Sequence, residues 1–457
     1  MAKSLRRVMG LRTVTSTSAG LAFAAIEYLA VAGLVIYVAG STGWIAIAVA
    51  GLLAVLVWGF YGELNGMYPT AAAIRLYMSK AMDDRAALSI TFTYMTTIVL
   101  VIAADAVIVG SAIGYLLGQS GWAVGVIIFA ILLGTVLSNL FGLRLAGGVQ
   151  DIATYSVLAA TVAITAYGLA HHGVNLPNLI APLAHKSPFD FVQAVAYGVF
   201  LYAAFEWVTA SAEEVLDIGL IPKGMFLAIL ALFATCSLIA IDMPLYLNKA
   251  QLYSAIPQLY LGANIAGYVG LVLMVVVTAV TAINTFNGGF ITASRFMYAA
   301  AREGNLPRMF SRLNTRAVPY VPVIGLATAS FIIAILVVLT NSWQTIVALG
   351  AALEGMIYSV AGLCVVRLRK KLPEQKRPFR LIGAKVLGWL GVVIFAFLAL
   401  AAATSVKGKT DFVPLALLLG LGILSTLYVL LLLPKIKARQ QARYEQKERR
   451  RPVRKEG

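Results

Sequence analysis

Long apolar runs recur along the whole chain, and only short polar segments separate them. A run of about 20 apolar residues crosses the hydrocarbon core of a bilayer as a helix, and by this criterion the chain has about twelve membrane spans. They are predicted at residues 14–39, 44–65, 88–117, 121–141, 149–170, 191–214, 224–247, 265–299, 321–340, 343–366, 384–404 and 412–434. We therefore expect an all-α integral membrane protein with one transmembrane domain (1–434) and a basic cytosolic tail (435–457).

Composition and charge agree with this prediction. Only 12% of the 457 residues are charged, whereas a soluble domain carries about 25%. With the N-terminus inside, all but four of the 36 Lys and Arg residues fall on the inner side of the membrane. The four on the outer side are Lys186, Lys249, Lys407 and Lys409. This asymmetry follows the positive-inside rule and predicts that both termini are cytoplasmic, in a cell inner (plasma) membrane. A lipid bilayer, and no nucleic acid, is the expected partner of the net charge of +17.

Several classes of protein are not expected, because the residues that their chemistry needs do not occur together. The chain has no G-x-x-x-x-G-K-[ST] phosphate loop, so transport driven directly by ATP is not expected. Cys236 and Cys364 both lie in apolar segments, and the three histidines are too few for a metal cage. We see no nucleophile–base pair, and we predict no enzyme activity, no metal site and no cofactor.

Three local motifs, in chain order, resemble those of the amino acid/polyamine/organocation (APC) permeases. The first is YGELNGMYPT at residues 61–70, where an acidic residue precedes a Tyr-Pro pair. The second is FLYAAFEW at residues 200–207, followed by AEE at 212–214 and IPKGM at 221–225. The third is SRFMYAAAREGNLP at residues 294–307. Together they cover most of the chain, at the spans where such permeases carry them.

The resemblance implies a LeuT-like fold with two inverted repeats, here residues 14–170 and 191–366, and two peripheral helices at 384–434. It also implies that spans 1 and 6 are broken near the middle of the bilayer. A broken helix exposes N–H groups at one end and C=O groups at the other, and these groups must face a cavity or a ligand. The N–H end favours anions and the C=O end favours cations, which suits an amino acid zwitterion.

Acidic residues within the spans are the main candidates for chemistry, because an ionised carboxylate in hydrocarbon is costly unless it faces a cavity or a partner. Glu206, in the expected break of span 6, is the strongest candidate for substrate recognition and proton coupling. Asp105 in span 3 and Glu27 in span 1 come next. Asp242 and Glu354 are equally well explained as packing or gate residues, and we do not place them in the site.

Further candidates follow from the resemblance and from depth in the membrane. The predicted substrate-binding residues are Gly20, Ala22, Ala25, Glu27, Asp105, Phe200, Tyr202, Ala203, Phe205, Glu206, Asn284 and Asn287. The aromatic residues can stack on an ammonium group or simply pack, and the asparagines can bind a ligand or another helix. The predicted gating residues are Trp207, Glu63, Arg75 and Arg295. With Glu213 and Glu214, the last three are expected to form ion pairs at an inner gate or to be solvated there.

The chain departs from the family pattern at two places. The first break, Ser18 to Glu27, has a single glycine, and Glu27 would repel a substrate carboxylate unless it were protonated or neutralised. Many proton-coupled relatives also place a lysine in span 5, where this chain has Val157. A carboxyl group, Glu206 or Glu27, is therefore the expected proton carrier, with sodium as an open alternative.

We predict a secondary transporter that imports an amino acid or a small organic amine by alternating access, coupled to protons. A cationic substrate is favoured, because up to three carboxylates approach the expected site. The alternatives are ion-independent exchange of an amino acid for an amine, and uptake of a neutral amino acid. A nutrient sensor is disfavoured, because the short tail holds no signalling domain.

Overall fold

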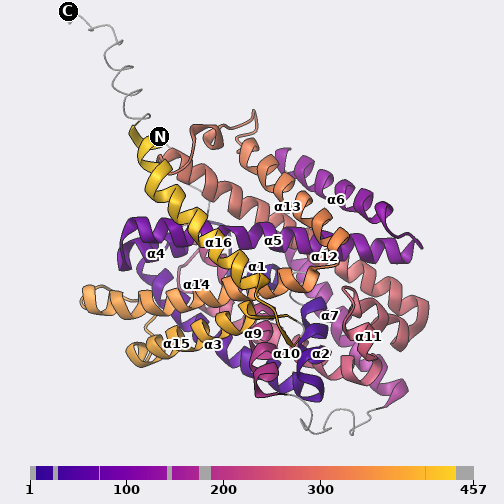
Figure 1. Cartoon of the computed structure of the whole chain (residues 1–457). Coiled ribbons are helices and arrows are strands. Elements are labelled where there is room, and N and C mark those ends of the chain that lie inside the picture. Colours follow the sequence, from indigo (N-terminus) through magenta and orange to yellow (C-terminus); the bar gives the residue numbers. More distant parts are fainter. Residues whose placement is uncertain are drawn as a thin grey trace, which may run out of the picture.

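The structure is a computed structural model, and it describes residues 7–23, 29–70, 73–141, 147–173, 187–406 and 408–438. Helices make up nearly all of this part of the chain (Figure 1). The α-helices are α1 (Leu11–Ala22), α2 (Val31–Ala39), α3 (Gly43–Met67), α4 (Ala73–Ala81), α5 (Asp84–Leu116), α6 (Trp122–Leu140), α7 (Gly147–His172), α9 (Pro188–Leu201), α10 (Leu220–Tyr246), α11 (Lys249–Leu252), α12 (Pro257–Arg302), α13 (Tyr320–Thr340), α14 (Trp343–Lys371), α15 (Ala384–Ala403) and α16 (Val413–Leu427). Short 3-10 helices are η2 (Gly40–Thr42), η3 (Phe205–Ser211) and η4 (Arg308–Ser311), and η5 (Tyr428–Leu432) is a π-helix. The strands β1 (Ser405–Val406) and β2 (Lys409–Thr410) form an antiparallel pair.

Eleven helices of the described residues are long and apolar enough to cross a membrane. They correspond to predicted spans 2 to 12. The predicted first span is not among them, because its described parts, α1 and α2, are two shorter helices. A helix satisfies its backbone hydrogen bonds within itself, which is why apolar runs of this length fold as helices in lipid.

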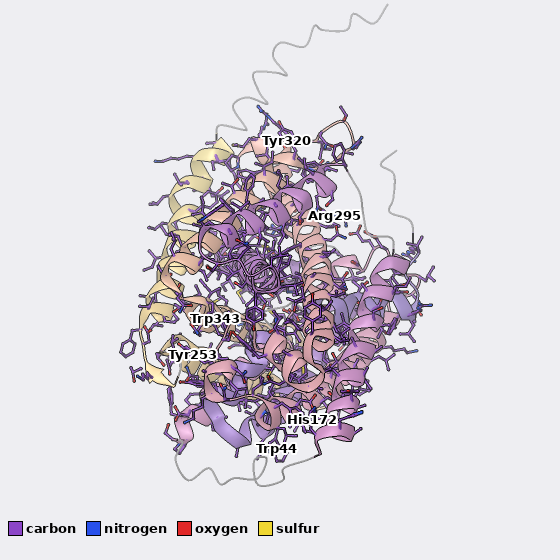
Figure 2. All side chains as sticks on the ribbon, turned by 90° about the vertical axis from the view of Figure 1, so that its right-hand side faces the viewer. Trp44, His172, Tyr253, Arg295, Tyr320 and Trp343 are labelled. Atoms are coloured by element: carbon purple, nitrogen blue, oxygen red, sulfur yellow. The ribbon has the colours of Figure 1, made fainter. Side chains whose placement is uncertain are left out.

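The two ends of the bundle differ in charge. We call the end where α3, α12 and α14 finish the basic face, and the other end the opposite face. Figure 2 shows Tyr320 and Arg295 toward the basic face, with Trp44 and His172 at the opposite face. Lys249 and Lys409, two of the four lysines predicted outside, lie in elements of the opposite face; Lys186 and Lys407 lie outside the described residues.

The helices differ in how far the bundle encloses them. Helix α5 runs through the centre and packs against α12, α13, α6 and α14. Helix α16, drawn in yellow in Figure 1, lies on the outside, and its apolar side chains such as Leu419, Ile423 and Leu424 are exposed. Exposed apolar side chains on a membrane span are suited to contact with lipid; that residues 384–434 form two peripheral helices stays a prediction.

Helix α12 is not one straight helix. Its backbone leaves the helical conformation at Ala266 and at Gly267, which has φ 61°, so that a segment from Pro257 precedes a kink. Glycine adopts this positive φ without the clash of a Cβ atom. The predicted start of span 8, at residue 265, therefore lies within a few residues of the kink, and the helical segment from Pro257 that precedes the kink was not predicted. Helix α4 was not predicted either, because it is too short and polar to read as a span.

Candidate substrate site

The sixth span is interrupted in the middle of the bundle. Helix α9 ends at Leu201, and η3 begins at Phe205 after a turn in which Ala204 has a left-handed backbone, with φ 70°. The hydroxyl of Ser18 on α1 donates to the backbone oxygen of Phe205 at 2.7 Å. This hydrogen bond ties the start of η3 to α1. The predicted discontinuity of span 6 is confirmed, and it places Glu206 in the first turn of η3.

A cavity of about 190 Å³ leads from the basic face to this break. Its deep end is formed by Tyr61, Tyr94, Glu206 and Trp207. Along α12 its wall runs from Ile291 to Glu303, which is roughly 18 Å of helix. The other lining residues are Ala73, Ile74, Arg75, Thr91, Met95, Ile98, Thr209, Ala210, Ser211, Thr292, Arg295, Phe296, Ala299 and Ala300. Four of the predicted residues therefore line one cavity: Glu206, Trp207, Arg75 and Arg295.

Glu206 is the carboxyl group at the deep end of the cavity, and it is only 1% exposed. The hydroxyl of Tyr358 on α14 donates to its Oε2 at 3.1 Å. The hydroxyl of Tyr94 on α5 lies 3.4 Å from its Oε1. Hydrogen bonds to both oxygens favour the charged form of a carboxyl group, so the site is built to hold a negative charge in a buried place.

Glu354 on α14 is a second carboxyl group beside Glu206, although it is not among the predicted site residues. Its two oxygens lie 3.2 and 3.3 Å from the Tyr94 hydroxyl, and it is fully buried without lining the cavity. The indole N–H of Trp207 donates to the same Tyr94 oxygen at 2.8 Å. Glu354 and Tyr358 are four residues apart and so lie on one face of a helix; that spacing is the signal in the sequence that could have identified the pair.

Two ion pairs lie at the mouth of the cavity, on the basic face. Arg75 on α4 contacts Glu303 at the end of α12, with 2.6 Å between Nη1 and Oε2. Arg295 on α12 contacts Glu214 just after η3, with 3.2 Å between Nη1 and Oε1. The predicted gate residues Arg75 and Arg295 therefore lie at the cavity mouth. Glu303, the partner of Arg75, belongs to the third motif but was not predicted as a gate residue.

Glu63 lies apart from this cavity. It is 1% exposed and forms a bidentate pair with Arg369, with both nitrogen–oxygen distances 2.6 Å. Arg377 contacts the same carboxylate at 3.2 Å, and the backbone N–H of Leu381 donates to it at 2.9 Å. These contacts tie the end of α3 to the loop between α14 and α15, so the structure does not bring Glu63 together with Arg75 and Arg295.

The aromatic candidates before the break pack against other helices. The Phe200 ring lies against Gly350 of α14, where a Cβ atom would be only 2.6 Å from it. The hydroxyl of Tyr202 lies 3.4 Å from the backbone oxygen of Ile47 on α3. Both are buried, as are Ala203 and Phe205, and none of the four lines the cavity. Their role in substrate binding stays a prediction.

The remaining candidates lie deeper or outside the described residues. Asp105 is fully buried on α5, eleven residues beyond Tyr94, or roughly 16 Å along the helix. Within α12, Asn284 is buried and its Oδ1 has no hydrogen-bond partner among the described residues, while Asn287 is half-buried. Gly20 and Ala22 are buried at the end of α1. The predicted residues Ala25 and Glu27 lie outside the described residues.

Asp151 on α7 is a buried acid that the predicted site does not include. Its carboxylate contacts Arg12 at 3.1 Å and accepts a hydrogen bond from Ser16, so it ties α7 to α1. Asp242 on α10 accepts a hydrogen bond from Thr165 on α7. In the described part of the chain, no three His, Cys, Asp or Glu side chains are grouped so that they could hold a metal ion.

Comparison with known proteins shows which family and which transport proteins this chain is similar to. Residues 9–424 match the family model described as amino acid permease. The chain is 22% identical over 392 residues to a gamma-aminobutyric acid permease of Bacillus subtilis, covering 82% of this chain and 81% of that protein. It is 25% identical over 421 residues to the aromatic amino acid transport protein AroP of Corynebacterium glutamicum, covering 85% and 88%.

A solved structure has the same fold. The manganese transporter of Eremococcus coleocola, in a mutant form, superposes with a TM-score of 0.62 over 93% of this chain and 94% of that one, at 13% identity. At this identity the likeness shows the fold alone. With the family match, it confirms the LeuT-like architecture that the sequence motifs predict.

Proposed function

Because this chain belongs to the amino acid permease family, we propose that it is a secondary transporter that takes up an amino acid or a small organic amine by alternating access, coupled to protons. The relatives named above are transport proteins, which supports a carrier and not an enzyme. The basic face is proposed to be cytoplasmic, by the positive-inside rule. The cavity would then be the inner half of the transport path in a plasma membrane.

Glu206 carries this proposal. Its carboxylate lies directly after a break in a membrane helix, at the deep end of the cavity, and aromatic side chains surround it. A charge in such a place is rare and costly, and it usually marks a substrate or ion pathway. An ammonium group is the complementary ligand, since it pairs with the carboxylate and is also attracted to the faces of nearby aromatic rings.

The charges around the cavity favour a substrate with net positive charge. The two arginines that line it, Arg75 and Arg295, are already paired with Glu303 and Glu214. Glu206 and the adjacent Glu354 are the acids near its deep end. A bound cation would neutralise the charge there, whereas the carboxylate of a zwitterion needs a further partner.

A neutral amino acid is the second candidate, and the named relatives favour it. Gamma-aminobutyric acid and aromatic amino acids carry an ammonium and a carboxylate group. The same Glu206 contact would hold their ammonium group. Glu206 would therefore bind the ammonium group of a cationic substrate and of a neutral amino acid alike. A neutral amino acid would need, in addition, a partner for its own carboxylate group.

A proton-linked mechanism needs a titratable group in the path. Val157, at the position where many relatives carry a lysine, is buried in α7 and does not titrate. Glu206 is the carboxyl group that lines the deep end of the cavity. We therefore propose that the proton acts on this carboxyl group.

Substitution of Glu206 by glutamine tests its role. Glu206→Gln keeps the shape of the side chain but removes the charge, and a hydrogen bond to a charged group contributes about 1.5–3 kcal/mol. Equilibrium binding to the purified protein, with putrescine, arginine, γ-aminobutyrate and phenylalanine as probes, should weaken by roughly 10- to 150-fold for whichever probe the wild type binds. Glu213→Gln changes an exposed acid seven residues further on and should leave binding unchanged. Equal affinity of Glu206→Gln and wild type would remove Glu206 from the site.

A further inference from the structure

We propose that Glu354 is a proton-holding group of this transporter: it keeps a proton while Glu206 is ionised and holds the substrate, and Tyr94 passes that proton to Glu206 when the substrate leaves. This inference rests on the proposed function and adds a residue to its site. Glu354 touches no part of the cavity, so it acts on the substrate only through Glu206.

The contacts of Tyr94 assign the proton to one of the two carboxyl groups. A tyrosine hydroxyl has one hydrogen to donate, and its oxygen also accepts hydrogen bonds. The Tyr94 oxygen lies within 3.4 Å of Glu206 and of Glu354, and it already accepts from Trp207. If both carboxyl groups were ionised, one hydrogen would have to serve two carboxylates. If one is protonated, it donates to the Tyr94 oxygen, and the tyrosine hydrogen is free for the other.

The second hydrogen bond of Glu206 decides which carboxyl group is ionised. Glu206 accepts from Tyr358 at 3.1 Å in addition to its contact with Tyr94. Among the described residues, Tyr94 is the one hydrogen-bond partner of Glu354. A carboxylate that accepts two hydrogen bonds is better stabilised than one with a single donor. The charge therefore belongs on Glu206 and the proton on Glu354.

The elements packed around Glu354 bring no opposite charge to it. The titratable groups that interact with Glu354 are Tyr94 on α5, Tyr61 on α3, Tyr358 on α14 and Glu206 on η3. Tyr77 on α4 and Cys364 on α14 lie further out, beside Tyr61. Arg75, also on α4, is paired with Glu303 at the cavity mouth. Apolar groups pack against the turns of α14 on either side of Glu354: Phe200 of α9 against Gly350, Phe395 of α15 against Tyr358, and Leu418 and Leu421 of α16 against the cluster of Leu349 and Leu353. An ionised Glu354 would have no cation to neutralise it among these groups.

The transfer step balances without any further reactant. The hydrogen of the Glu354 carboxyl group moves to the Tyr94 oxygen as the Tyr94 hydroxyl hydrogen moves to Glu206. Glu354 becomes a carboxylate, Glu206 becomes an acid, and Tyr94 is unchanged. The ammonium group on Glu206 loses its counter-charge and is released into the cavity. To complete the cycle, Glu206 gives this proton to water in the cavity, and Glu354 takes up a new proton when the site opens to the opposite face. One proton is thereby used for each substrate molecule released.

Glu354→Gln should affect proton coupling without affecting substrate binding. The amide donates to the Tyr94 oxygen as a protonated carboxyl group would, so Glu206 keeps its charge and its substrate. Equilibrium binding to the purified protein, with the probe that the wild type binds, should stay within about twofold of wild type, and transport is then measured in proteoliposomes. Accumulation driven by an imposed pH gradient, measured with the same probe, should fall to the level without a gradient. Glu354→Asp keeps a titratable group and should retain part of the accumulation, and Glu374→Gln, an exposed loop change, should retain all of it.

The outcomes distinguish this inference from the function on which it rests. Wild-type accumulation that Glu354→Gln retains would overturn the role of Glu354 and leave the proposed function standing. Loss of equilibrium binding in Glu354→Gln would also overturn it, because the amide is expected to leave the Glu206 site intact. A wild-type protein that shows no accumulation in a pH gradient would overturn the proton coupling itself, and this inference with it.

Discussion

At the scale of single residues, the site depends on the backbone at Ala204, which adopts φ 70° in the turn just before η3. An L-residue with a Cβ atom pays about 1–2 kcal/mol for a left-handed conformation. Strain of this kind persists where the surrounding structure enforces it, and it is common at functional sites. Here it ends α9 early and turns the chain so that Glu206 lies at the end of the cavity.

Replacement of Ala204 by glycine should relieve this strain. Because glycine adopts positive φ freely but loses more backbone entropy on folding, the expected gain is about 0.5–1 kcal/mol in the free energy of unfolding. Thermal unfolding of the purified protein in detergent measures it. Ala203→Gly is the matched control: Ala203 is not among the residues with positive φ, so glycine should destabilise the protein there. Equal losses in both variants would show that Ala204 is not strained.

The role of a residue could be predicted from the sequence where its side chain is of a type that is costly to bury in a membrane span. Glu206 is predicted because an acid in the middle of a span is costly, and the structure does place it at the deep end of the cavity. Glu354 is just as buried, but its importance comes from Tyr94, which is distant in sequence. Phe200 and Tyr202 are predicted as ligands; they contact α14 and α3, and their role in substrate binding stays a prediction. A span that is apolar on every side gives no hydrophobic face from which its rotation can be read.

At the scale of elements, three segments meet at the mouth of the cavity: α4, the end of η3, and the end of α12. The ion pair of Arg75 and Glu303 joins α4 to α12, and that of Arg295 and Glu214 joins η3 to α12. The backbone oxygen of Asn305 also accepts from Tyr428, which connects this region to the peripheral helix. We propose that the two ion pairs separate when the mouth widens.

Removal of one charge from the Arg75–Glu303 pair should favour the open mouth. Partly exposed ion pairs contribute about 0.2–1 kcal/mol, so Arg75→Gln and Glu303→Gln should each raise access to the cavity by up to about fivefold. The rate at which a water-soluble thiol reagent modifies a cysteine placed at Thr292, which lines the cavity, measures this access. The two native cysteines are buried.

The charge-swapped double variant, Arg75→Glu with Glu303→Arg, is the control for this prediction. It should return the modification rate toward that of wild type, since the pair is restored with opposite polarity. A rate that stays high in the swapped protein, or that never rises in the single variants, would show that the pair does not hold the mouth.

The sequence predicted long elements well and short or interrupted ones poorly. The spans after the first are confirmed within a few residues, because about 20 apolar residues in a row specify a membrane helix. The break in span 6 was expected from the family resemblance and not from hydropathy. Helix α4 and the kink at Gly267 gave no hydropathy signal: α4 is short and half-polar, and a kink changes direction without changing composition.

At the scale of the whole molecule, the bundle combines an apolar outer surface with a cavity that ends at Glu206. The cavity leads from the basic face to this residue. The opposite half of the described bundle holds buried polar side chains such as Asp242 and Gln258. A site reached from one face, with packed side chains beyond it, is what alternating access requires of each of its two end states.

The overall architecture was the most predictable feature of the protein. The uneven distribution of Lys and Arg and the apolar spans predict a polytopic membrane protein before any resemblance is considered. The motifs around Glu63, Glu206 and Arg295 predict the family, and the match over residues 9–424 confirms it. The substrate could not be predicted in the same way, since it depends on a few side chains whose neighbours come from distant parts of the chain.

Proton-driven uptake by the wild-type protein is the most direct test of the proposed function. Purified protein in liposomes would be given labelled putrescine and, separately, γ-aminobutyrate, with the outside more acidic than the inside, with no gradient, and with unlabelled substrate inside. We expect accumulation above the external concentration with the pH gradient alone, and greater accumulation of putrescine than of γ-aminobutyrate. Flux that ignores the gradient and requires substrate on both sides would contradict proton-coupled uptake and identify an exchanger instead.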